Sequence, residues 1–166
     1  MTWIQSQQGV IPKCKPPNVH QFLRSRKEGN GCLVETIQRF LNKATTMEYN
    51  HMTSALTTVN KKLPFNRLMK DAQDILRRGI LIKCLEAVVL SIYLTNPVPG
   101  MDRIPLGFVS EEGGQTRRHI ILLIRYKSEW GALGLSRRDD LAGRAMKTFP
   151  DVVELIKDYH QAYINS

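Results

Sequence analysis

One long apolar segment near the middle of the chain constrains the fold more than any other feature. Residues 80–94 read ILIKCLEAVVLSIYL, and the run is interrupted by Lys83, Glu86 and Ser91. Its apolar side chains cover most sides of a helix, so we predict a buried helix that includes positions 81 and 82 and ends before Pro97. The run is shorter than the roughly 18 apolar residues of a membrane span, so we predict no membrane segment.

Two β-type runs follow this helix. Residues 104–109 and 119–126 are rich in apolar and β-branched residues, and the Glu-Glu-Gly-Gly sequence at 111–114 is typical of a hairpin loop. The second run, HIILLIRY, is continuously apolar in its middle, which indicates an interior strand covered on both faces. With amphipathic helices expected at 64–79 and 149–164, the predicted fold class is α+β, with helices packed on a mainly antiparallel sheet.

The 166 residues suffice for one domain, which we divide into three parts. Residues 1–30 contain three prolines and several basic residues, and they are expected to form a basic arm. Residues 31–79 form a helical subdomain, which includes an amphipathic pattern at 32–44. Residues 80–166 carry the buried helix and the sheet and form one compact unit with 31–79.

The charge balance points to an anionic partner. Lysine and arginine number 24 against 15 acidic residues, which gives a net charge of +9. With two Trp, and five each of Tyr and Phe, the chain shows no interleaving of aromatic and basic residues, so nucleic acid is not the expected partner. Three cysteines without a C-x-x-C pair fit a reduced compartment, and the N-terminus lacks a secretory signal, so we expect a cytoplasmic protein.

Cys84 and His119 are the residues that could carry chemistry. Cys84 lies at the start of the buried helix, directly after Lys83. The helix N-terminus and the lysine ammonium both favour the thiolate form of a cysteine, which is the nucleophile. A free cysteine also commonly fills space in an apolar core. His119 opens the interior strand and could be the base for this thiol, or its ring could cap the strand end. The sequence has no metal-binding motif and no glycine-rich phosphate loop, so we expect no metal or cofactor.

Four segments together resemble a known family. They are IKCLEAVVLSIYLTN at 82–96, RHI at 118–120, WGALGLSRRDDL at 130–141 and YNH at 49–51. In this order and spacing they resemble the vasohibins, which are transglutaminase-like cysteine peptidases that remove the C-terminal tyrosine of α-tubulin. The resemblance covers about residues 33–163.

The resemblance implies a transglutaminase-like fold in which residues 80–166 form the catalytic subdomain. It implies a nucleophile, its base, the third member of a triad and an oxyanion-site tyrosine, which are Cys84, His119, Ser136 and Tyr49. It also implies a basic pair that holds the terminal carboxylate of the substrate, Lys83 and Arg137. From the net charge we expect further contacts with an acidic tail at basic positions, namely Lys61, Lys62, Arg67 and Arg125.

The partner implied by the resemblance is the C-terminal tail of α-tubulin on microtubules, which fits a cytoplasmic, cytoskeleton-associated protein. Known vasohibins also bind a small helical partner, the small vasohibin-binding protein. Two other interpretations stay open at this point. One is a non-enzymatic basic module that binds microtubules or nucleic acid through charge alone, and the other is a cysteine hydrolase of similar fold with a different substrate.

Overall fold

The structure is a computed structural model that describes residues 49–50, 59–137, 141 and 147–165. In chain order its elements are α4 (Phe65–Arg78), α5 (Cys84–Thr95), β1 (Asp102–Glu112), β2 (Gln115–Tyr126), β3 (Glu129–Leu133) and α7 (Val152–Asn165). Helices and an antiparallel sheet are both present, as the predicted α+β class requires. The arm expected at 1–30 and the helix expected at 32–44 lie outside the described residues.

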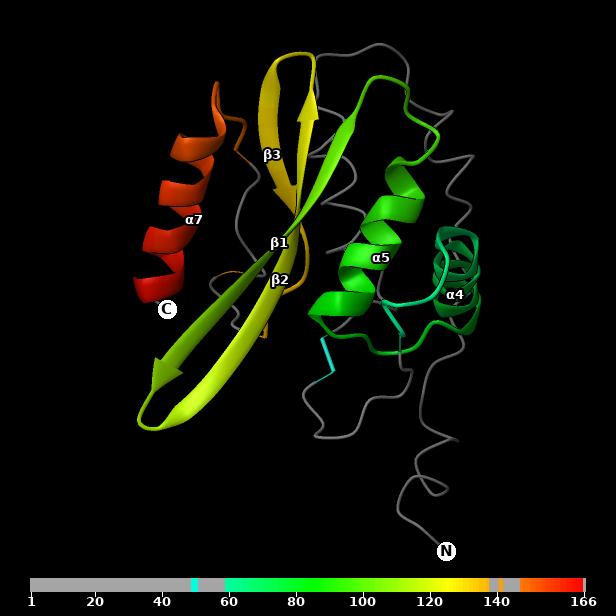
Figure 1. The fold of residues 1–166 in the computed structure, drawn as a ribbon, viewed down its shortest axis with the longest axis horizontal. Helices are drawn as coiled ribbons and strands as arrows, with labels where there is room; N and C mark the ends of the chain where they lie inside the picture. Colours follow the sequence, from blue (N-terminus) through cyan, green and yellow to red (C-terminus); the bar gives the residue numbers. More distant parts are fainter. Residues whose placement is uncertain (1–48, 51–58, 138–140, 142–146, 166) are drawn as a thin grey trace, which may run out of the picture.

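The sheet is an antiparallel meander in the order β1-β2-β3. Both strands of the first hairpin are longer than the sequence predicted, and they pair from Asp102↔Arg125 to Glu112↔Gln115. The turn between them has positive φ at Gly113 and Gly114, a conformation that glycine adopts without strain, and the loop expected at this position is therefore confirmed. The distal end of this hairpin extends away from the helices (Figure 1). The sequence analysis had not predicted a strand at β3.

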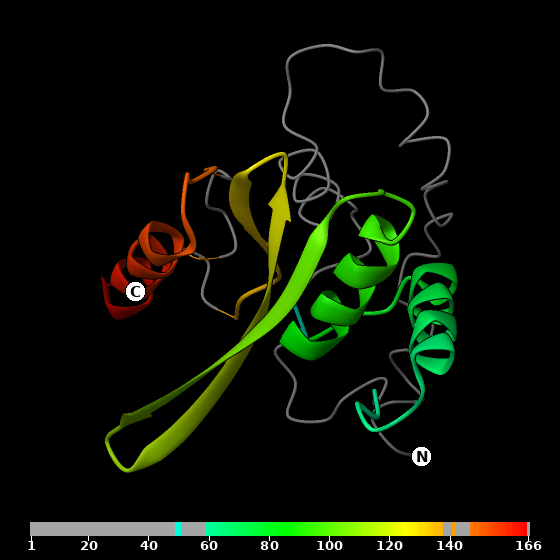
Figure 2. The same ribbon diagram turned by 45° about the horizontal axis from the view of Figure 1, so that its top comes forward.

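Strand β2 is covered on both faces, as its continuous apolar run predicted. Leu122 and Ile124 belong to the core that includes α4 and α5. Ile121 and Leu123 point to the opposite face, where they pack with Leu155 of α7. The layers therefore run in the order α7, sheet, α5 and α4 (Figures 1 and 2). Because successive side chains of a strand alternate between faces, each position of β2 is assigned to one of the two layers.

Helix α4 ends where its sequence predicted. Gly79 adopts a left-handed conformation with φ of 57°, and its N–H donates a hydrogen bond to the carbonyl of Ile75 at 3.0 Å. This C-cap satisfies one of the carbonyls that the last turn leaves without a partner. Ala72, Ile75 and Leu76 are the buried residues of α4.

Helix α5 begins at Cys84, later than the predicted helix, so the assignment of positions 81 and 82 to it is wrong. Ile82 instead forms a parallel bridge with Tyr49, and its carbonyl accepts a hydrogen bond from the N–H of Asn50 at 2.8 Å. Lys83 is the extended N-cap, and its N–H donates to the Glu86 carboxylate at 3.1 Å. The bridge therefore removes Ile82 from the helix and fixes where α5 starts.

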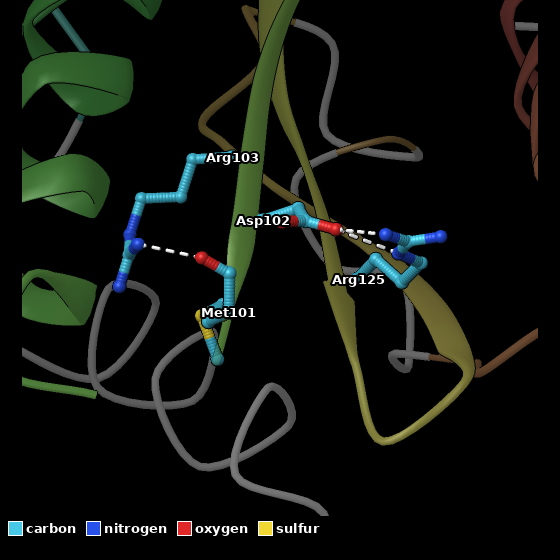
Figure 3. A network of polar contacts seen from close by, with 4 residues as sticks. All are labelled: Met101, Asp102, Arg103 and Arg125. Atoms are coloured by element: carbon cyan, nitrogen blue, oxygen red, sulfur yellow. Dashed lines mark hydrogen bonds and ion pairs between the residues drawn. The ribbon is translucent and has the colours of Figure 1, made fainter. Parts of the chain in front are cut away.

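Arg103 of β1 ties the sheet to the C-terminal end of α5. Its Nε donates to Thr95 Oγ1 at 2.9 Å, its Nη1 to the Met101 carbonyl at 2.7 Å, and its Nη2 to the carbonyls of Thr95 and Val98. The contact with Met101 is drawn in Figure 3. The Arg103 guanidinium therefore donates hydrogen bonds to several carbonyls near the C-terminal end of α5, where the last carbonyls of a helix have no N–H partner within the helix.

The neighbouring side chain of β1 points to the other side of the strand. Asp102 accepts from Arg125 Nε at 2.7 Å and also pairs with Arg125 Nη2 (Figure 3). Both side chains are about half exposed, at 51% and 53%. Of these two adjacent residues, Arg103 therefore forms a partly buried hydrogen-bond network, whereas Asp102 forms an exposed ion pair that solvent screens.

We expect Arg103→Lys to lower the free energy of unfolding by about 2 kcal/mol, because a lysine leaves several carbonyls at the end of α5 unpaired. Urea denaturation followed by circular dichroism measures the change. The matched control is Arg125→Lys, for which we expect a loss of less than about 1 kcal/mol because that pair is exposed. Equal losses in the two variants would contradict the assigned role of Arg103.

Candidate active site

Tyr49 is brought to the start of α5 by main-chain pairing. The Tyr49↔Ile82 bridge sets it beside the segment that leads into Cys84. Burial raises the pKa of the Tyr49 hydroxyl; the nearby Cys84 and Glu86 raise it further, whereas Arg137 lowers it. Tyr49 therefore has a neutral hydroxyl that can donate a hydrogen bond. It lies close enough to the Cys84 thiol and the Arg137 guanidinium for their charges to affect its pKa.

The thiol of Cys84 is partly buried at the first position of α5. Burial raises its pKa, and this outweighs backbone hydrogen bonds from Ile120 and Leu85, which lower it; the nearby Glu86 raises it further. The main chain at the helix N-terminus lowers this pKa, as predicted, but burial outweighs it, so the net shift is opposite to the predicted one. Cys84 is a protonated thiol at neutral pH, and it needs a base before it can act as a nucleophile.

The main chain of Ile120 relates the thiol to β2. A backbone hydrogen bond from Ile120 is among the effects that lower the pKa of the thiol, so Cys84 lies near β2 at the residue that follows His119.

The imidazole of His119 lies on the α7 side of β2. His119 pairs with Phe108 of β1, and its Nε2 is 2.8 Å from the hydroxyl of Tyr159. Its ring stacks on that of Tyr159 with 6.2 Å between centroids and 9° between planes. Burial lowers the pKa of His119 from 6.5 to about 4, so the ring is neutral at neutral pH and can accept a proton. The hydrogen bond described for this ring goes to Tyr159, which the sequence analysis had not considered as its partner.

The chain after β3 runs beside the same part of β2. A Cβ added to Gly134 would lie 3.3 Å from Cγ2 of Ile121, so the two main chains stay close beyond the last paired residue. Two residues further on, Ser136 lines the same cavity as His119. Ser136 is buried, with 7% of its surface exposed.

A cavity of about 480 Å³ brings several of the predicted residues together. Four of them contribute to its lining, namely Tyr49, His119, Ser136 and Arg137. The others that line it had not been singled out, and they are Gln115, Thr116, Arg117, Arg118 and Tyr163. Lys61 and Lys62 lie instead in the exposed turn before α4, apart from the described lining of the cavity. Arg67 is likewise exposed on α4, and Arg125 forms an ion pair with Asp102.

Three features of this region were missed by the sequence analysis. Tyr159 lies in the helix expected at 149–164, and no role in the site was assigned to it. Glu86 is 6% exposed and caps α5, and its sequence signal is an acidic residue in the first turn of a helix. Arg117 and Arg118 immediately precede His119 on β2, so their place beside the histidine could have drawn attention to them.

Neither a metal site nor a membrane-spanning helix is present among the described residues. Within these ranges, no three His, Cys, Asp or Glu side chains gather closely enough to hold a metal ion. Likewise, no helix in this part of the chain combines the length and the apolarity needed to cross a bilayer.

Comparison with known proteins assigns the family. The sequence model of the Vasohibin family matches residues 3–166. The chain belongs to the vasohibin family. Tubulinyl-Tyr carboxypeptidase 1 of Mus musculus is 38% identical to this vasohibin over 153 residues, which make up 92% of the chain and 39% of that relative. The vasohibin chain therefore spans about two fifths of the length of the relative it matches.

We expect iodoacetamide to alkylate Cys84 of this vasohibin slowly at neutral pH, with a rate that rises to an inflection above the value of about 8.5 for a free thiol. The reason is that burial raises the pKa of the thiol, so little thiolate is present at pH 7. Peptide mass spectrometry measures the rate at Cys84 alone. The protein unfolded in urea is the control, and its inflection should return to the ordinary value. An inflection below pH 8 in the folded protein would contradict this result.

Proposed function

We propose that this chain is a cysteine-type carboxypeptidase that removes the C-terminal tyrosine from an acidic peptide tail, with the tail of α-tubulin as its substrate. The observation that carries the proposal is the cavity shared by Tyr49, His119, Ser136 and Arg137. Cys84 is not among the residues described as lining it, but the bridge of Tyr49 to Ile82 connects the cavity to the segment that leads into Cys84. The name of the relative, Tubulinyl-Tyr carboxypeptidase 1, supports the reaction and the substrate.

The charge of the cavity suits an acidic substrate with a free C-terminus. Arg117, Arg118 and Arg137 all contribute to its lining. A guanidinium can bind a carboxylate with two parallel hydrogen bonds, so Arg137 is suited to hold the terminal carboxylate, with Lys83 as the second cation. The net charge of +9 adds a longer-range attraction for glutamate-rich tails, which salt would weaken.

The first chemical step uses two groups that are neutral at rest. His119 accepts the thiol proton of Cys84 while the sulfur attacks the carbonyl carbon of the penultimate residue. The carbonyl oxygen becomes an oxyanion, which accepts hydrogen bonds from the Tyr49 hydroxyl and from N–H groups at the start of α5. A neutral Tyr49 is needed for this role, and its raised pKa is consistent with it.

The remaining steps return the enzyme to its starting state. The carbon–nitrogen bond breaks, and the imidazolium of His119 gives its proton to the departing amine of tyrosine. Water then attacks the thioester with His119 again as the base, and the sulfur leaves as a thiol. One water is consumed, and the products are free tyrosine and the shortened peptide. Ser136, which lines the same cavity as His119, would act as the third member of the set by helping to orient the imidazole.

The cellular expectations follow from the same proposal. A protein that acts on tubulin tails works in the cytoplasm, in association with the cytoskeleton. The small helical partner implied by the resemblance would be a requirement additional to the residues described here, so activity is best assayed with and without such a partner.

The first test is release of free tyrosine from a peptide that ends in Glu-Glu-Tyr, measured by chromatography. We expect Cys84→Ala to reduce the rate at least about 1,000-fold, because the variant removes the nucleophile. The same peptide with a C-terminal amide is the control for carboxylate recognition, and it should be cleaved far more slowly. Unchanged release by Cys84→Ala would refute the proposal that Cys84 is the nucleophile, whereas no release by the unmodified protein would favour the charge-only binding module.

The second test concerns the terminal carboxylate. We expect Arg137→Ala to lower kcat/KM for the free-acid peptide by roughly 10- to 100-fold, which corresponds to the loss of a charge-assisted hydrogen bond, and to reduce the preference over the amide. Arg77→Ala is the matched control, since it removes one positive charge from an exposed ion pair on α4. A similar loss in both variants would mean that net charge, and not a carboxylate site, determines the rate.

A further inference from the structure

Tyr159 holds the distal nitrogen of His119. Its hydroxyl is 2.8 Å from Nε2, although the two residues are 40 positions apart in the chain. The phenol is fixed by packing, since it stacks on Phe108 with 5.3 Å between centroids and joins the apolar cluster of Ile121, Leu123 and Leu155. The hydroxyl therefore has a defined position relative to the strand that carries the histidine.

Holding Nε2 determines where the other ring nitrogen can lie. In histidine, Nδ1 is bonded directly to Cγ, so it stays near the main chain of its own residue, whereas Nε2 lies at the far side of the ring. With Nε2 fixed to α7, Nδ1 remains beside β2. The main chain of Ile120, the residue after His119, is one of the groups that lower the pKa of the Cys84 thiol. Anchoring the distal nitrogen thus leaves Nδ1 as the ring nitrogen that Tyr159 does not engage.

We propose that Tyr159 is a positioning residue for His119, and that its hydroxyl oxygen accepts the Nε2–H and so keeps the lone pair of the neutral ring on Nδ1, toward Cys84. The proposal rests on the proposed function and adds to it a group outside the expected Cys84, His119 and Ser136 set. The tautomer of a histidine is set by the hydrogen bond that its other nitrogen makes, so a tyrosine oxygen can select the basic nitrogen.

The same hydrogen bond assists the step in which the ring becomes charged. Burial disfavours the imidazolium, as the lowered pKa of His119 indicates. When His119 takes the thiol proton, both ring nitrogens become donors, and the Tyr159 oxygen continues to accept from Nε2–H. The positive charge of the imidazolium then keeps a polar partner at Nε2.

Tyr159→Phe is the direct test, because it removes the hydroxyl and retains the stacked ring. We expect kcat for the Glu-Glu-Tyr peptide to fall roughly 10- to 100-fold with KM nearly unchanged, since the hydrogen bond acts on the base and not on the substrate. Tyr93→Phe is the matched control; it removes a hydroxyl that accepts from Gln73 on the α4 side of α5, and it should leave kcat unchanged. Ser136→Ala compares the other candidate for orienting the ring.

A spectroscopic measurement makes the test independent of turnover. In ¹⁵N-histidine-labelled protein, we expect the shifts of His119 to report a proton on Nε2 at neutral pH, and Tyr159→Phe to give a mixture of the two tautomers. A proton on Nδ1 in the unmodified protein, or an unchanged tautomer and kcat in Tyr159→Phe, would overturn the proposal. So would a loss seen in Ser136→Ala but not in Tyr159→Phe. If the unmodified protein releases no tyrosine while the tautomer still depends on Tyr159, the proposed function fails and the hydrogen bond stands.

Discussion

The coverage of β2 on both of its faces is the constraint on which the candidate site depends. Because side chains alternate along the strand, burial of Leu122 and Ile124 under α5 directs Ile121 and Leu123 toward α7. The same alternation directs His119 to the α7 side, next to a tyrosine. A shift of the register by one residue would exchange the two sets and turn the imidazole into the α5 core, so the apolar run fixes the orientation of the histidine.

Packing keeps the side chains of Cys84 and His119 uncharged at neutral pH. Burial acts in opposite directions on the two groups, since it raises the pKa of an acid such as Cys84 and lowers that of a base such as His119. The permanent charges of the site lie instead on the arginines that line the cavity. This separation is consistent with the proposed peptidase, in which the cations would attract an anionic tail and the thiol would become a nucleophile only as its proton is transferred.

The sequence predicted the features that depend on local pattern. The α+β class, the buried strand, the hairpin turn and the end of α4 at Gly79 all follow from periodicity and from glycine chemistry. Family resemblance, not periodicity, singled out Tyr49, Ser136 and Arg137, and these three share the cavity with His119. Their catalytic and binding roles stay predictions.

The features that the sequence did not predict depend on tertiary contacts. The start of α5 is set by the bridge to Tyr49, which lies more than 30 residues earlier in the chain. The pKa of Cys84 follows from burial, which outweighs the local effect of a helix N-terminus. The contact between Tyr159 and His119 joins residues 40 positions apart, and an amphipathic helix pattern cannot state which of its side chains meets a given strand residue.

Because α7 contributes contacts to His119, the candidate site persists only as long as α7 stays packed on the sheet. This helix packs on the sheet through a small cluster around Leu155, separate from the larger core of α4, α5 and the opposite face of β2. Detachment of α7 alone would deprive His119 of its hydrogen bond and of two stacked rings, while the larger core stayed intact. Proteins open such sub-global units at a lower free energy than that of complete unfolding. Inactivation by heat would then precede loss of the bulk of the secondary structure, and amide exchange in α7 would follow the same temperature dependence as inactivation.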